Sequence, residues 1–256
     1  MPTRTLRLAL VVAVLSSTGC ATVIDSAVDA AARRTGQSIG EAAGQAASRI
    51  PTGGLGTFTP ELTTLYVGYL FSLGFHSGSY TFEERAYEPG EWTRWVVEGD
   101  DSTEMERAFI ARTDEGGEWW RVKYADREEG EAIVLEGLFS ADRNELIRLR
   151  AQMPGEDEPS ELPVQEGSYG YAAPIKLTEE SVAGATVGTE TIRVPAGSFK
   201  ARHIRYGSGS GTIEWWLTDQ VPGGLVRYST HQADGESVTV ELSAHGRGAV
   251  SELGAF

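Results

Sequence analysis

Cysteine is almost absent from this sequence. Cys20 is the only one among 256 residues, so the chain cannot form an internal disulfide. A metal site built on several thiolates is excluded for the same reason. The histidines are equally sparse: none of the four stands at the spacing of a helical metal pair such as H-E-x-x-H. A zinc site would need ligands from distant strands, and the sequence predicts no metal and no cofactor.

Motifs that carry catalysis are also missing. The G-x-S-x-G elbow is absent, because the tract Gly207–Gly211 has Gly209 at its centre and Ser208 and Ser210 as turn residues. The glycine-rich phosphate motifs are absent as well. We therefore expect no enzymatic activity. A hydrolase whose carboxylates and histidines meet only in the folded chain is the alternative.

Positive charge is scarce. The chain has 22 basic and 37 acidic residues, a net charge of −15, which argues against binding to nucleic acid phosphates and to anionic lipid heads. Short acidic runs include Glu128-Glu129, Glu156-Asp157-Glu158 and Glu179-Glu180. We interpret these runs as solvated surface. A calcium site is the alternative, although no EF-hand loop pattern is present.

Long apolar runs are lacking too. The most apolar stretch, residues 8–15, is too short to span a bilayer. Arg4 and Arg7 precede it, and the small residues Ser16–Gly19 follow it directly. A charged segment, a short apolar segment and a small-residue cleavage site together predict that residues 1–19 are a secretory signal peptide.

The end of that segment, Ser17-Thr18-Gly19-Cys20, resembles the lipobox of bacterial lipoproteins. It departs from the usual pattern at Ser17, where leucine is common. The resemblance implies that Cys20 becomes the mature N-terminus and carries acyl chains, palmitate among them. Ala21 rather than aspartate implies the outer membrane, with the protein facing the periplasm. Loss of Arg4 and Arg7 leaves 20 basic residues against 37 acidic ones, a net charge of −17.

Residues 20–57 are rich in alanine and glycine. Small residues recur every four positions, at Ala32, Gly36, Gly40, Gly44 and Ser48. This spacing resembles the glycine zippers of some outer-membrane lipoproteins and would suit a self-associating or membrane-lying helix. Glycine weakens a helix, so a partly helical tether followed by a linker at 51–56 is the favoured interpretation.

A buried helix is predicted over residues 59–75. Thr59 is suited to the N-cap, Pro60 to the first helical position and Glu61 to the first turn. Apolar residues follow at spacings of three and four: Leu62, Leu65, Tyr66, Tyr69, Leu70 and Leu73, with Phe71 widening the stripe. A strand over 66–75 is the alternative.

Strand signals repeat from Trp92 onward. Alternation and β-branched or aromatic residues predict strands at 93–98, 105–112, 119–125, 132–139, 145–153, 186–194, 199–206, 212–218, 225–231 and 237–244. Residues 154–174 hold four prolines and show no periodicity, which predicts a long loop, either a lid or a surface excursion. We expect one domain over 58–248 and a tail at 249–256.

Two turns frame the stretch that carries the strongest strand signals. Val194–Gly197 has the residues of a type I turn, and Val221–Gly224 those of a type II turn. Between them, alternation sends Trp215 and Trp216 to opposite faces of a strand. The simpler interpretation places Trp215 in the core and Trp216 under a helix or loop; the alternative makes one ring the wall of an apolar groove.

His203 breaks the alternation of its strand. Phe199 and Ala201 predict that His203 points inward, while Ile204 also requires burial. A β-bulge would reconcile these demands. We expect a structural histidine bonded to a neighbouring strand.

The stretch VPAGSFKARHIRY followed by EWWLTDQVPGGLVRY resembles the C-terminal half of bacterial envelope proteins with the fold of the lipoprotein carriers LolA and LolB. The resemblance covers about residues 185–243. It implies a mainly β (α+β) fold in which a curved antiparallel sheet, an incomplete barrel, wraps one or more helices and leaves an apolar cavity. The same patterns occur in families of unknown function, so the fold carries over better than any activity.

Together these observations predict a lipid-anchored bacterial envelope protein that binds a lipid or another apolar ligand in the concave face of its sheet. The groove candidates are Leu65, Tyr69, Phe71, Trp119, Trp215 and Trp216. The alternative is a structural or adaptor lipoprotein that has an envelope protein partner and no small-molecule ligand. Neither interpretation involves nucleic acid.

Overall fold

The computed structural model describes residues 75, 82, 84–98, 103–126, 132–143, 145–164, 177–208, 211–233, 235 and 237–254. Several predictions fall outside these residues: the signal peptide, the lipidation of Cys20, the tether, and the helix over 59–75 except for Phe75. The groove candidates Leu65, Tyr69 and Phe71 lie outside them as well.

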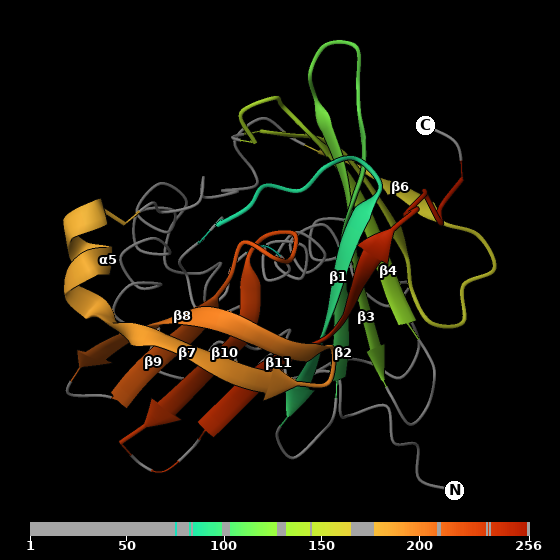
Figure 1. Cartoon of the computed structure of the whole chain (residues 1–256). Coiled ribbons are helices and arrows are strands. Elements are labelled where there is room, and N and C mark those ends of the chain that lie inside the picture. The colour runs from blue at the N-terminus through green and yellow to red at the C-terminus, as the bar shows by residue number, and fades with distance from the viewer. Residues whose placement is uncertain are drawn as a thin grey trace, which may run out of the picture.

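One antiparallel sheet of eleven strands dominates the described chain (Figure 1). The strands are β1 (Glu91–Glu98), β2 (Thr103–Arg112), β3 (Glu118–Asp126), β4 (Ala132–Phe139), β5 (Leu146–Gln152), β6 (Ser160–Leu162), β7 (Thr186–Val194), β8 (Gly197–Ser208), β9 (Gly211–Leu217), β10 (Leu225–Gln232) and β11 (Ser237–Arg247). The predicted mainly β, antiparallel architecture is confirmed.

The sheet consists of two meanders joined at their first and last strands. Its order is β6-β5-β4-β3-β2-β1-β11-β10-β9-β8-β7, so β1 pairs with β11 in the middle. The two halves run in different directions in Figure 1, which shows a strongly bent sheet. β6 and β7 are the edges and do not pair with each other, so the sheet is open rather than closed into a barrel.

Two short elements were not predicted. Among the described residues the single helix is α5 (Glu179–Ala185), which buries no residue. Thr178 caps it by accepting a hydrogen bond from the Ser181 N–H, and Glu179 and Glu180 lie in its first turn. The other element is β6, which lies within the predicted loop 154–174 and pairs with β5.

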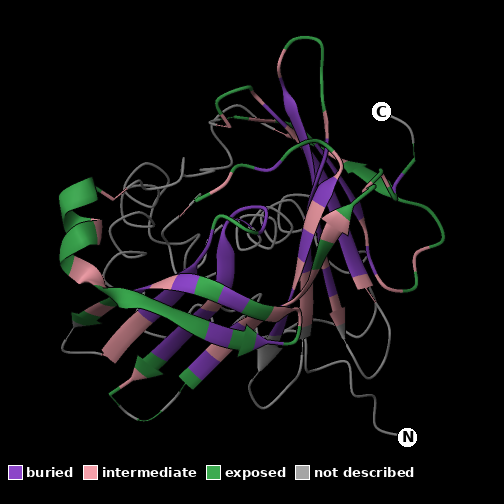
Figure 2. Ribbon diagram, in the orientation of Figure 1, coloured by how far each residue is buried: buried purple, intermediate pink, exposed green. Residues whose placement is uncertain are grey.

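Strand alternation and register divide the sheet into two faces. We call the inner face the one that carries Trp95, Phe109, Trp120, Trp215 and Tyr228, which are all buried. The opposite, outer face carries Arg94, Glu106, Arg121, Glu136 and Arg150 on β1–β5, together with apolar residues such as Trp119. Figure 2 shows that burial extends over most strands, whereas β7 is exposed over much of its length. The sheet is therefore covered on both sides over most of its width.

The two predicted turns are present. Pro195 and Ala196 connect β7 to β8, with Val194 opposite Gly197. In the second turn the Gly224 N–H donates to the Val221 carbonyl, 3.1 Å away, and Gly223 has a φ of +72°, as a type II turn requires.

His203 and Ile204 are both buried without a bulge in β8 at this point, because they face opposite, covered sides of the sheet. The expected bulge in β8 is therefore wrong. The register with β9 is unbroken, and the irregularity lies in β7, between Thr186 and Gly188.

Candidate functional site

Trp215 is a core residue of the inner face. Its side chain is fully buried, and three rings surround it: the centroid distances are 5.2 Å to Phe82, 5.9 Å to Tyr206 and 5.8 Å to Tyr228. Contacts of this kind stabilise aromatic cores. The ring has no exposed surface with which to line an open groove.

Trp216 lies on the outer face, as alternation predicts, and is also buried. Its ring stacks on His203 with a centroid distance of 4.4 Å and an interplanar angle of 16°. Its Nε1–H donates to Glu190 Oε1 over 2.7 Å, and the Arg227 guanidinium lies 5.4 Å from the ring centroid. Among the described residues, side chains of neighbouring strands cover this ring.

Trp119 also lies on the outer face, because its neighbour Trp120 points to the inner one. It is buried, and its Nε1–H donates to Glu136 over 3.1 Å. Trp119 and Trp215 consequently face opposite sides of the sheet. The structure does not bring the three described groove candidates together into one groove.

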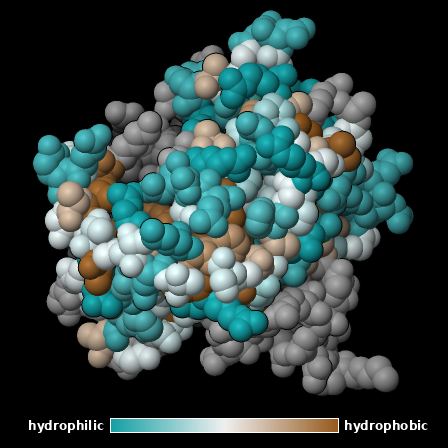
Figure 3. Space-filling view, viewed as in Figure 1, coloured by the Kyte–Doolittle hydropathy of each residue, from teal (hydrophilic) through white to brown (hydrophobic). Residues whose placement is uncertain are grey.

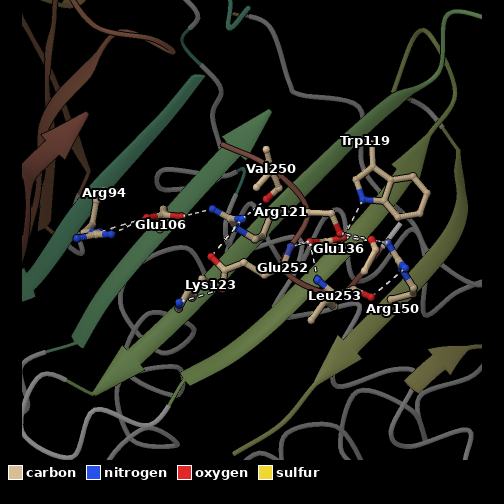
Figure 4. A network of polar contacts seen from close by, with 12 residues as sticks. Arg94, Glu106, Trp119, Arg121, Lys123, Glu136, Arg150, Val250, Glu252 and Leu253 are labelled. Carbon is tan, nitrogen blue, oxygen red and sulfur yellow. Dashed lines mark hydrogen bonds and ion pairs between the residues drawn. The ribbon is translucent and has the colours of Figure 1, made fainter. Parts of the chain in front are cut away.

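The outer face instead carries a row of alternating charges across five strands, which we call the charged ladder (Figure 4). Its members are Arg94, Glu106, Arg121, Glu136 and Arg150, on β1 to β5 in that order. Glu106 bonds Arg94 Nη2 at 2.8 Å and Arg121 Nη2 at 2.7 Å. Glu136 bonds Arg150 Nη2 at 3.1 Å. All members except Arg94 are buried.

Opposite charges shift the pKa values of Glu106 and Arg94 toward the charged forms. Burial of Glu106 alone would raise its pKa, but hydrogen bonds from Arg121 and Arg94, with the charges of both, hold the pKa below the usual value. Burial would lower the pKa of Arg94, and the hydrogen bond and charge of Glu106 raise it instead. The Glu106 carboxylate and the Arg94 guanidinium are thus both held in their charged forms at neutral pH.

Residues 249–254, predicted as a free tail, lie across the ladder, and we call them the C-terminal strap (Figure 4). The Glu252 and Leu253 N–H groups donate to Glu136 Oε1 over 2.8 and 3.4 Å. Arg150 Nη1 donates to the Leu253 carbonyl over 3.1 Å. At the other end, Arg121 donates to the Val250 carbonyl over 2.5 Å. Charged side chains of the sheet therefore hold the backbone of the strap.

A hollow of about 280 Å³ lies between the strap and strands β1–β3. It is lined by Trp92, Arg94, Glu106, Arg121, Lys123, Gly248, Ala249, Val250 and Glu252. The Glu252 carboxylate closes one side by pairing with Arg121 and Lys123, at 3.1 Å each. The hollow is polar and open, so it suits a charged or hydroxylated group better than an acyl chain.

The charged ladder and the strap were not predicted. One signal was available: Glu136 is the only charged residue of the otherwise apolar strand 132–139, and a charge at such a position requires a buried partner. The partners themselves come from other strands. Alternation cannot identify them before the strand order is known.

A second polar cluster surrounds His203. Its Nδ1 lies 3.2 Å from Glu190 Oε1, and its Nε2 lies 3.1 Å from Glu214 Oε1. The expected bonding of this histidine to neighbouring strands is confirmed. Arg205 also contacts Glu214, so a cation already occupies the carboxylate. Within the part of the chain that the structure describes, no group of three or more candidate metal ligands occurs.

The described residues include no helix that is long and apolar enough to cross a membrane.

No model of a known protein family matches this chain, and no curated protein is similar to it in sequence. Several solved structures are similar, among them the following two. One, from Bacteroides fragilis, is described as an exported protein with a YmcC-like fold; it is 13% identical, with a TM-score of 0.35, and the match covers 63% of this chain and 98% of that one. The other, from Parabacteroides distasonis, is described as a lipoprotein; it is 13% identical, with a TM-score of 0.34, covering 65% and 99%.

Proposed function

We propose that this chain is a lipid-anchored bacterial envelope protein, held in the outer membrane through acyl chains on Cys20. The support is the order of charged, apolar and small residues that ends at the only cysteine. The test is labelling of cells with radioactive palmitate. The full-length chain should take up label and fractionate with membranes, and Cys20→Ala should abolish both. A Cys20→Ala chain that is labelled equally would refute the anchor.

The sheet domain, in this proposal, is a rigid adaptor without catalytic activity that contacts another envelope component through its outer face. One observation carries the choice: the described groove candidates are closed, whereas the hollow beside the strap is open and polar. The visible surface in Figure 3 is mainly hydrophilic. The large exposed apolar residues of the described chain, Ile147, Val187 and Val250, lie on different elements. A partner would therefore bind through polar contacts.

Photo-crosslinking in intact envelopes tests the adaptor function. A crosslinking residue in place of Lys123, beside the hollow, should capture a discrete partner. The matched control places the crosslinking residue at Thr189, which is exposed on the edge strand β7, and several strands separate β7 from β3 in the sheet. Equal capture from both positions, or from neither, would contradict the choice of this face.

A second candidate function is binding of a lipid or other apolar ligand on the inner face. It is favoured by the aromatic residues that line this face, among them Trp95, Trp120 and Trp215. It is also the function implied by the resemblance of about residues 185–243 to the LolA and LolB carriers, which rests on the sequence alone. Native mass spectrometry of the Cys20→Ala chain, purified without detergent, separates the two functions. If the protein is an adaptor, the spectrum should show the mass of the chain alone. A reproducible added mass that can be extracted and identified as lipid would favour the binding of an apolar ligand.

A further inference from the structure

The way in which the strap is held differs from ordinary strand pairing. The strap forms no strand of the sheet. Its backbone is bound by side chains instead: Glu136 accepts two consecutive N–H groups, and Arg121 and Arg150 donate to carbonyls at either end. The strap can therefore leave this site without breaking any strand pair of the sheet.

The site also selects the side chains of the strap. The Ser251 hydroxyl donates to Glu136 Oε2 over 2.8 Å. Glu252 pairs with the cations of Arg121 and Lys123, and Leu253 is buried, with 5% of its surface exposed. The hydroxyl, the carboxylate and the apolar group of three successive strap residues thus each have a suitable environment in the groove. The groove is complementary to this particular peptide, and every copy of the chain carries that peptide.

A single glycine, Gly248, connects β11 to the fixed part of the strap. Gly248 has a φ of +93°, and a Cβ placed on it would meet no atom within 4 Å. Beyond it, the Ala249 N–H donates to the Gly90 carbonyl over 2.9 Å, which is the first fixed point of the strap. Glycine at this position permits the chain to leave in other directions at little conformational cost. The ladder pairs Arg94–Glu106 and Glu136–Arg150 involve no strap residue and would keep the groove in shape.

We propose that the groove over the charged ladder is a peptide-binding site shared between molecules, and that the strap of one copy of this chain docks into the groove of a second copy. The contacts in the exchanged pair are those seen within one chain. The balance between the two arrangements is therefore set by the protein concentration relative to the effective concentration of the strap attached to its own chain. This inference goes beyond the adaptor function and does not depend on the anchor at Cys20.

The salt bridge between Lys123 Nζ and Glu252 Oε2, at 3.1 Å, provides a test on the unaltered sequence. Full-length ¹⁵N-labelled and unlabelled chains are mixed in equal amounts, incubated, and treated with a carbodiimide, which joins an amine to an adjacent carboxylate. Mass spectrometry then reads each crosslinked peptide pair. A crosslink with both halves of the same isotope does not require exchange, and a crosslink with one heavy half joins two molecules.

We expect mixed-isotope crosslinks between Lys123 and Glu252 that approach about half of the total at high protein concentration. Their share should fall on dilution and on addition of excess synthetic peptide spanning residues 248–256. Glu252→Gln is the control and should remove the crosslink, because it has no carboxylate to activate. Same-isotope crosslinks alone at every concentration would overturn the exchange. Absence of the crosslink altogether would overturn the docking of the strap itself.

Discussion

Replacement of Glu136 by glutamine tests the central feature of the outer face. The carboxylate of Glu136 is fully buried. Its Oε2 accepts from Trp119, Arg150 and Ser251, and its Oε1 accepts from two N–H groups of the strap. A glutamine presents one oxygen and one NH₂ group, so at least two of the five donors would face another donor. Arg150 would also lose the opposite charge that now lies 3.1 Å from its Nη2.

The expected decrease in the free energy of unfolding follows from these lost contacts. A buried donor without an acceptor costs about 1–3 kcal/mol, and removal of one member of a buried ion pair costs about 3–5 kcal/mol. These effects share the same atoms and are not additive, so we expect Glu136→Gln to lower the free energy of unfolding by about 3–5 kcal/mol. For a domain of this size the melting temperature should fall by roughly 6–20 °C.

The assay is equilibrium unfolding in urea, followed by tryptophan fluorescence and circular dichroism. Glu161→Gln is the matched control: it makes the same chemical change in the ion pair with Arg148, where both side chains are more than 40% exposed. Exposed pairs contribute little, so this control should lose less than about 1 kcal/mol. If Glu136→Gln loses no more than the control does, the charged ladder is not a major source of stability and the reasoning above is wrong.

Two further predictions concern pH and backbone geometry. The pKa of Glu106 lies below the usual value of 4.5 in the folded chain, so its ionisation stabilises the fold above that pH. This contribution is lost as the pH falls through the lowered pKa. Urea unfolding at pH 7 and pH 3 should show the loss of stability, and Glu106→Gln should reduce that loss. Gly223→Ala should lose about 2–4 kcal/mol in the same assay, because its φ is +72° and a Cβ would lie 2.5 Å from a ring carbon of Tyr87. Gly235→Ala is the control, since its φ of +97° is also positive but a Cβ there meets open space; equal losses would show that the contact with Tyr87 is unimportant.

Local sequence determines the strands well because their signals are local. Period-2 alternation with β-branched and aromatic residues places ten of the strands within three residues of their observed ends. The least regular of these, predicted over 145–153, is β5. The strand β6 has three residues, too few to show a period, and it exists because β5 offers it a pairing edge. The helix α5 has no buried face, so only its cap at Thr178 and its acidic first turn could have indicated it.

The faces of the sheet illustrate the limit of alternation. The sequence predicts correctly that Trp215 and Trp216 point in opposite directions, because successive side chains in a strand always do. It does not indicate which side chains of one strand share a face of the sheet with which side chains of another strand. The sequence therefore leaves Trp119 and Trp215 together as groove candidates, and the register places the two on opposite faces.

By itself, the sequence determined the antiparallel β architecture and the turns around Gly197 and Gly223, because each depends on neighbours within a few residues. The lipid anchor at Cys20, which also depends on a local pattern, stays a prediction. Only the tertiary structure decided that β1 pairs with β11, that Glu136 meets Arg150 on the next strand, and that residues 249–254 lie on the sheet instead of forming a free tail. Each of these contacts joins residues that are chosen by strand order and register. The free energy that selects them comes from burying charges and rings against distant parts of the chain, and no local pattern records it.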